Sequence, residues 1–231
     1  MTMNPFQELN TTLIACRLCH RLVAWREQVA REKRRAYRDW DYWGKPVPGF
    51  GDLAARVLVV GLAPGAHGSN RTGRMFTGDA SGDFLYAALH RAGFANQPVT
   101  KHREDNLALR DMFISAVCRC APPDNRPTPA EITTCLPYLR QEMALLTQMQ
   151  VIVALGHIAF DTILHLYADC YQGTNFEMRR FQFSHGASYH LGPYDPHLVA
   201  SYHPSRQNTQ TGRLTPAMFD AVWIATLALL R

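Results

Sequence analysis

The chain has 231 residues, of which 47% are hydrophobic and 19% are charged, and its formal net charge is +5. This length is enough to bury a sizeable core in one α/β domain. The sequence contains no run of about 18 apolar residues, and its start, MTMNPFQELN, lacks an apolar signal core. We therefore expect neither a membrane span nor secretion, and we expect a cytoplasmic protein.

The positive charge is concentrated near the N-terminus. Residues 16–45 carry nine basic and four acidic side chains, whereas the rest of the chain carries 15 of each sign. Arginine makes up 21 of the 24 basic residues, and its planar guanidinium suits bidentate contacts with phosphate. The segment therefore predicts an anionic partner through Arg17, Arg21, Arg26, Arg31, Lys33, Arg34, Arg35, Arg38 and Lys45.

Helical signals run over residues 11–38, and a loop rich in proline and glycine follows as far as residue 52. Cys16 and Cys19 form a C-x2-C pair at the start of this segment. Such a pair suits a metal site or a redox dithiol, but a thioredoxin-like motif follows a strand, and this pair follows the polar start of the chain. Context therefore favours a metal.

The remaining cysteines are Cys118, Cys120, Cys135 and Cys170. The first two share one face of an alternating strand, so periodicity does not decide which of them joins Cys135. Four thiolates fit structural zinc or an iron–sulfur cluster, and spacing alone does not separate the two. The simpler alternative is that the cysteines are small buried apolar residues. No other cysteine lies near Cys170 in the sequence at a spacing typical of paired metal ligands.

Apolar runs alternate with helical patterns through the rest of the chain. Runs without alternation indicate strands buried on both faces, as in a parallel sheet. They occupy 56–62, 112–118, 151–155 and 197–202. Helices are expected from Asp79 or Ser81 to Gly93, from Pro129 to about Gln148, after Gly156, and from about Thr215 to Leu230. The pattern predicts a three-layer α/β/α sandwich around a mainly parallel sheet, with functional residues at the carboxyl ends of the strands.

The loop after the first strand, GLAPGAHGSNRTGRMFTGD, is rich in glycine and polar residues. It lacks the Lys-Ser/Thr ending of a phosphate-binding loop and the G-x-G-x-x-G of a dinucleotide site. Phe76 is its one aromatic residue, suited either to stacking on a planar ligand or to a place in the core.

The loop after the last strand, SYHPSRQNTQTGR, begins with a histidine and contains two arginines and no acid. Its Arg, Ser, Asn and Thr side chains are of the types that contact nucleic acids. A histidine at a strand end is often structural, but the loop beside His203 suits an anionic partner and therefore favours a catalytic role for this residue.

These two loops, together with RCAPPDNRPTP after the second strand, resemble the motifs of the type 5, or B-type, uracil-DNA glycosylases. The resemblance covers nearly the whole chain. It implies one domain over 1–231, with a basic, cluster-bearing segment at 1–50 and an α/β/α core at 51–231. It also implies a 4Fe-4S cluster, which ties down the N-terminal helical segment, and hydrolysis of the N-glycosidic bond of damaged deoxynucleotides.

The resemblance also assigns roles to individual residues. It implies cluster ligands at Cys16, Cys19, Cys120 and Cys135, with Cys120 preferred because it directly precedes Ala-Pro-Pro. Phe76 matches the aromatic residue that stacks on the flipped base, and His203 matches the histidine of the His-Pro-Ser motif. Asp79, which also suits a helix cap, is the candidate for positioning water. Asn125 and Asn70 are candidate polar helpers, and further substrate contacts are expected from Gly61, Ala63, Gly65, His67, Ser205 and Arg206.

The expected function is therefore a DNA repair glycosylase that acts on uracil and other damaged bases in DNA, and we expect it to be a monomer. The alternative is a non-catalytic iron–sulfur or zinc module that binds nucleic acid. Under either reading, the basic segment is expected to add salt-sensitive, sequence-independent affinity for DNA.

Overall fold

The computed structural model describes residues 4–171, 176–193 and 195–230. Among them, six strands form one sheet in the order β1-β3-β2-β4-β6-β5. Their bounds are β1 Phe50–Gly51, β2 Val57–Gly61, β3 Met112–Ala116, β4 Val151–Leu155, β5 Ser188–His190 and β6 His197–Ser201. The four central strands run parallel, while β1 and β5 pair antiparallel at the two edges. All residues of β2, β3 and β4 are buried, as their continuous apolar runs predict.

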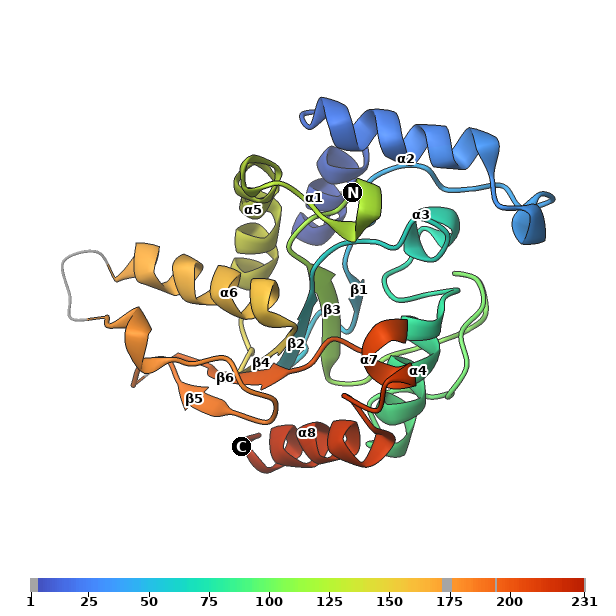
Figure 1. The fold of residues 1–231 in the computed structure, drawn as a ribbon. Helices are drawn as coiled ribbons and strands as arrows, with labels where there is room; N and C mark the ends of the chain where they lie inside the picture. The colour runs from blue at the N-terminus through green and yellow to red at the C-terminus, as the bar shows by residue number, and fades with distance from the viewer. Residues whose placement is uncertain (1–3, 172–175, 194, 231) are drawn as a thin grey trace.

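Helices cover both faces of the sheet (Figure 1). Val57 and Val59 of β2 belong to a core cluster that includes apolar side chains of α4 and α8. Leu58 and Val60 point to the other face and join a cluster with side chains of α5 and α6. The longer helices are α1 Pro5–Ile14, α2 His20–Glu32, α4 Ala80–Arg91, α5 Pro129–Leu145, α6 His157–Cys170 and α8 Pro216–Ala228.

Local sequence signals set the starts of three helices. Asp79 caps α4, and Thr215 caps α8 through the backbone amide of Met218. Thr128 and Glu131 form a reciprocal capping box at the start of α5. These helices begin within two residues of the expected positions.

The helix expected over residues 11–38 is wrong as a single element. The chain forms α1 and α2 with a reversal at residues 16–19, followed by a 3-10 turn at Arg35–Tyr37. The reversal allows Leu13 at the end of α1 and Leu22 at the start of α2 both to be buried, which favours the break although no glycine or proline marks it.

Short elements also interrupt segments expected to be loops. The strands β1 and β5, the helices α3 (Ser69–Thr72) and α7 (Arg206–Gln210), and 3-10 turns at Pro123–Asn125 and Met178–Arg180 were not predicted. Among the described residues, no helix has the length and apolar character needed to cross a bilayer.

Candidate functional site

The ring of Phe76 lies over the carboxyl end of β2. Phe76 has a left-handed backbone, with φ of 51°, and its side chain is buried. A Cβ placed on Gly61, the last residue of β2, would lie only 2.7 Å from Phe76 Cζ. Gly61 is therefore needed for the close approach of this ring, a role that the substrate-contact prediction did not include.

His203 follows β6 and meets Phe76. Their ring centroids are 5.8 Å apart, with an interplanar angle of 31°. The backbone carbonyl of His203 accepts a hydrogen bond from Asn208 Nδ2 at 2.9 Å, which fixes the start of the loop. Burial lowers the pKa of His203 to about 4, so its imidazole is neutral at physiological pH. The structure thus places an aromatic face beside a neutral imidazole, which can donate one hydrogen bond.

The two carboxylate oxygens of Asp79 have different surroundings. Oδ1 accepts hydrogen bonds from the amides of Ser81 and Gly82, both at 3.1 Å, and so caps α4. Oδ2 faces the glycine-rich loop: a Cβ on Gly65 would lie 2.8 Å from it, and a Cβ on Gly68 would overlap it. Burial raises the pKa of Asp79. The helix-cap alternative is therefore observed, and a second oxygen is left beside the loop.

His67 and Asn70 connect the glycine-rich loop to the N-terminal segment. His67 Nδ1 and the Tyr42 hydroxyl form a hydrogen bond of 3.1 Å. Asn70 is fully buried, and its side-chain amide donates to the carbonyls of Arg26 and Ala66. These contacts are structural, and the substrate roles of His67 and Asn70 stay predictions.

The other predicted contact residues are spread along the same edge of the sheet. Ala63 is half-buried in the loop after β2, and Ser205 caps α7 through the amide of Asn208 at 3.3 Å. Arg206 and Asn125 are exposed, and Asn125 has φ of 55°. No hydrogen bond within the described ranges joins Asn125 to Asp79 or His203.

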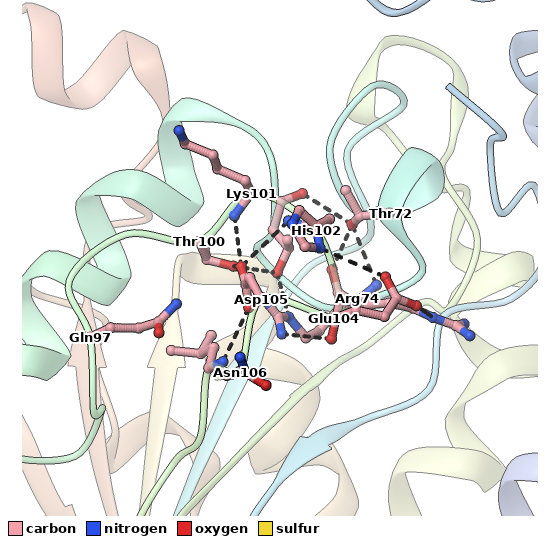
Figure 2. A network of polar contacts seen from close by, with 12 residues as sticks. Thr72, Arg74, Gln97, Thr100, Lys101, His102, Glu104, Asp105 and Asn106 are labelled. Atoms are coloured by element: carbon pink, nitrogen blue, oxygen red, sulfur yellow. Dashed lines mark hydrogen bonds and ion pairs between the residues drawn. The ribbon is translucent and has the colours of Figure 1, made fainter. Parts of the chain in front are cut away.

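A polar network that the sequence did not reveal braces the loop of Phe76 (Figure 2). Arg74 is buried and pairs with Asp105 at 2.7 Å, while its Nε donates to Thr77 Oγ1 at 3.0 Å. Burial acts to raise the pKa of Asp105, but the bonds from Arg74 and from backbone amides outweigh it and lower the pKa to about 2. The ion pair ties the segment around residues 100–107 to the loop, two residues before Phe76.

The four cysteines named as ligands line one small hollow. Cys16 and Cys19 lie in the reversal between α1 and α2, Cys120 follows β3, and Cys135 lies in α5. The hollow is also lined by apolar residues, among them Leu13, Leu22 and Val23. Cys118 does not line it, although its side chain hydrogen-bonds that of Cys135 and both belong to the core cluster on that face of the sheet. The lining of the hollow therefore includes Cys120 and not Cys118.

Arg26 supplies a test of what the hollow can hold. Its side chain is buried; one terminal nitrogen donates to Cys120 Sγ at 2.7 Å and the other to the carbonyl of Cys16 at 3.2 Å. Nε is buried without a hydrogen-bond partner, and no carboxylate of the described chain pairs with this guanidinium. A buried cation without an anion is costly. Thiolates bound to an iron–sulfur cluster would provide the missing negative charge, so the donor set fits that group.

Across the residues described, no three His, Cys, Asp or Glu side chains come close enough together to hold a single metal ion. A backbone amide, that of Arg119, donates to Cys135 Sγ at 3.3 Å. Hydrogen bonds of this kind are typical of cysteine-ligated clusters.

The sequence analysis named Arg26 only among the basic residues expected to meet an anionic partner, and it missed the place of this side chain at the cysteines. Leu22, Val23, Arg26 and Val29 are the buried residues of α2, and they fall at helical spacing. An arginine at a core position of an amphipathic helix was therefore a readable signal of a buried anionic partner.

The fold and the site together define an α/β enzyme with an aromatic ring, a neutral imidazole and a carboxylate near the carboxyl ends of parallel strands. Residues 48–226 match the model of the uracil DNA glycosylase superfamily. A type-5 uracil-DNA glycosylase of Thermus thermophilus is 54% identical over 210 residues, covering 90% of both chains. That of Mycobacterium leprae is 52% identical, covering 94% of this chain and 92% of its own, and that of Pyrobaculum aerophilum is 42% identical, covering 91% and 87%. The chain belongs to the uracil-DNA glycosylase superfamily.

Proposed function

We propose that this chain is a DNA repair glycosylase that removes uracil, and other deaminated or damaged bases, by hydrolysing the N-glycosidic bond. The observation that carries the proposal is the pairing of Phe76 with His203, whose ring centroids lie 5.8 Å apart at the carboxyl ends of β2 and β6. The type-5 uracil-DNA glycosylases that resemble it over about nine-tenths of their length support the same activity. A non-catalytic nucleic-acid module is not favoured.

The reaction needs a base that has left the helix. Flipping costs a few kcal/mol, least for a mispaired base such as uracil opposite guanine. The flipped base would stack on the Phe76 ring, in the space bounded by the glycine-rich loop and His203. The Gly61 position matters here because it lets the ring lie directly over the strand end.

Breaking the bond between C1′ and the base nitrogen leaves negative charge on the base and positive charge on the sugar. Neutral His203 would donate a hydrogen bond to a base oxygen, and such a donor is worth about 2.7–4 kcal/mol in comparable sites. In its ionised form Asp79 would offset the sugar's charge, and its Oδ2 would orient a water whose oxygen bonds to C1′ and would accept the proton that this water loses. Asn125 and Arg206, both exposed, would contact the DNA around the extruded nucleotide.

We further propose that Cys16, Cys19, Cys120 and Cys135 hold a 4Fe-4S cluster. When bound, the cluster would supply iron–thiolate bonds that join the N-terminal segment to the core. Arg26 supports this assignment because its buried charge has no carboxylate partner among the residues that the structure describes. Purified protein should be brown and absorb near about 400 nm, with iron and sulfide in matching amounts. Colourless protein with stoichiometric zinc would refute the cluster.

The activity is tested by incubating the protein with duplexes that contain uracil, hypoxanthine or ethenocytosine, followed by alkali. Cleavage at the uracil position supports the proposal, whereas DNA binding without cleavage supports the non-catalytic alternative. Asp79→Asn sharpens the test because asparagine caps helices as well as aspartate does. We expect an unchanged melting temperature and at least tenfold slower single-turnover excision, a loss of about 1.4 kcal/mol. If the variant excises uracil at the wild-type rate, Asp79 acts only as the N-terminal cap of α4.

A further inference from the structure

The basic N-terminal segment divides into two sets of cations. Arg17 pairs with Glu27, Arg21 pairs with Glu131, and Arg26 is buried at the cysteines. The others lie at the end of α2 and in the chain that follows it. Within the described ranges, five of them are exposed and take part in no ion pair: Arg31, Arg34, Arg35, Arg38 and Lys45. We call these five the arm cations.

The arm cations are held in place by a stacked arginine from the glycine-rich loop. The Arg71 guanidinium lies 3.9 Å from the ring centroid of Tyr37 and 4.0 Å from that of Trp40. The same group donates hydrogen bonds, each of 2.8 Å, to the carbonyls of His67 and Gly78. Arg71 therefore connects the chain around Tyr37 and Trp40 to both ends of the loop that carries Phe76.

Further bonds run alongside this clamp. The backbone amide of Trp43 donates to the Arg71 carbonyl at 2.9 Å, that of Gly44 donates to the Asn70 carbonyl at 3.0 Å, and Tyr42 bonds His67. The charge of Arg34 helps to lower the pKa of His67, after the larger effect of burial, which places Arg34 near the loop. One groove is lined by residues of α1 and α2, Arg31 among them, and by Tyr42, Trp43 and Lys45. The arm cations therefore flank the loop and stand in a fixed relation to it.

We propose that the arm cations form a second DNA-contact surface, which binds the phosphates flanking the damaged nucleotide, and that Arg71 clamps this surface to the loop of Phe76. Five exposed cations without carboxylate partners suit a polyanion, and a clamp of two aromatic rings and two hydrogen bonds keeps them ordered before DNA arrives. The position of this surface beside a damaged nucleotide rests on the proposed function, whereas binding to the DNA backbone needs no excision.

The test measures the affinity for an undamaged duplex by fluorescence anisotropy at several KCl concentrations. Arg34→Ala/Arg35→Ala/Arg38→Ala is compared with Arg110→Ala/Arg179→Ala/Arg180→Ala, which removes the same charge from exposed arginines, two of which share Glu177 as an ion-pair partner. Each lost phosphate contact lowers the log–log salt slope by about 0.9, so three contacts lower it by about 2.7. Between 50 and 200 mM salt, the wild type should therefore lose about 40-fold more affinity than the arm variant. The control should keep a slope close to that of the wild type.

Equal salt slopes for the arm variant and the wild type would refute the proposed surface. An equal fall in slope in the arm and control variants would also refute it, because such a result would reflect net charge alone. If the wild type does not excise uracil but the slopes differ as expected, the proposed function fails and the surface stands.

The clamp has its own variant, Tyr37→Leu/Trp40→Leu, which keeps every cation. We expect at least about threefold weaker binding at 100 mM KCl, because the loosened cations must be ordered on binding. Circular dichroism and the melting temperature will show that the fold is kept. Wild-type affinity in this folded double variant would overturn the clamp while leaving the surface intact.

Discussion

The contact between Gly61 and Phe76 allows the function of the aromatic ring to be tested without removing it. In Gly61→Ala the new Cβ would lie 2.7 Å from Phe76 Cζ and 3.0 Å from Cε2, whereas ordinary contacts of a Cβ begin at 3.4 Å. The ring must therefore move by about 0.7 Å, the difference between 3.4 and 2.7 Å. Phe76 is only 9% exposed and belongs to a packed core cluster, so the movement meets resistance.

Two measurements follow from this displacement. Overpacking of this kind costs about 1–3 kcal/mol. For a chain of this size, that corresponds to a fall in melting temperature of roughly 2–12 °C, to be measured by calorimetry. A misplacement of about 1 Å in an active site can cost 100-fold in rate, so we expect single-turnover excision of uracil to fall by about 10- to 100-fold.

The double variant Gly61→Ala/Phe76→Leu separates the two effects. Replacing the ring with leucine removes the overlap, so the melting temperature should return toward that of the wild type. Excision should stay slow because no aromatic face remains for the base. If Gly61→Ala is destabilised yet excises uracil at the wild-type rate, the position of the ring does not matter and the stacking role of Phe76 is refuted.

Two further predictions concern buried groups. Because burial lowers the pKa of His203 to about 4, the ring is neutral from pH 6 to 8. His203→Asn should therefore lower the excision rate at least about tenfold, by the same factor at every pH in that range. A ratio of wild-type to variant rates that changes with pH would contradict this. Its folded pKa also lies below the unfolded value of about 6.5, so the unfolded state binds the proton more tightly, and wild-type stability should fall from pH 6.5 toward 4 more than that of the variant. Arg26→Met removes the donor to Cys120 Sγ and its buried charge, and loss of such a supporting contact typically costs 10–100-fold in metal affinity. Wild-type iron content and resistance to chelator in this variant would exclude a role for Arg26 at the cluster.

The central sheet was predictable because burial on both faces leaves continuous apolar runs, and β2, β3 and β4 carry them. Helix starts at Asp79, Thr128 and Thr215 were predictable because capping is a local interaction. The reversal at residues 16–19 was not, since tertiary burial of α1 and α2 decides it. A strand as short as β1 shows no periodicity at all.

The approach of Phe76 to His203 could be anticipated because parallel strands bring their carboxyl ends to one edge of a sheet. The clamp of Arg71 between Tyr37 and Trp40 could not, because it joins residues more than 30 positions apart with no shared pattern. The same holds for the bond between Arg26 and Cys120, which spans 94 positions. Sequence patterns thus located the strand ends but not the contacts that hold the N-terminal segment beside them.

The two edges of the sheet bear on how the protein behaves in concentrated solution. An open strand edge exposes unpaired amides and carbonyls, which can template pairing with another chain. Here the edge strands are β1, with two residues, and β5, with three, and both run against the direction of the parallel core. Each edge of the described sheet therefore offers too short a ladder for a second copy to extend, and strand length alone limits edge-to-edge aggregation.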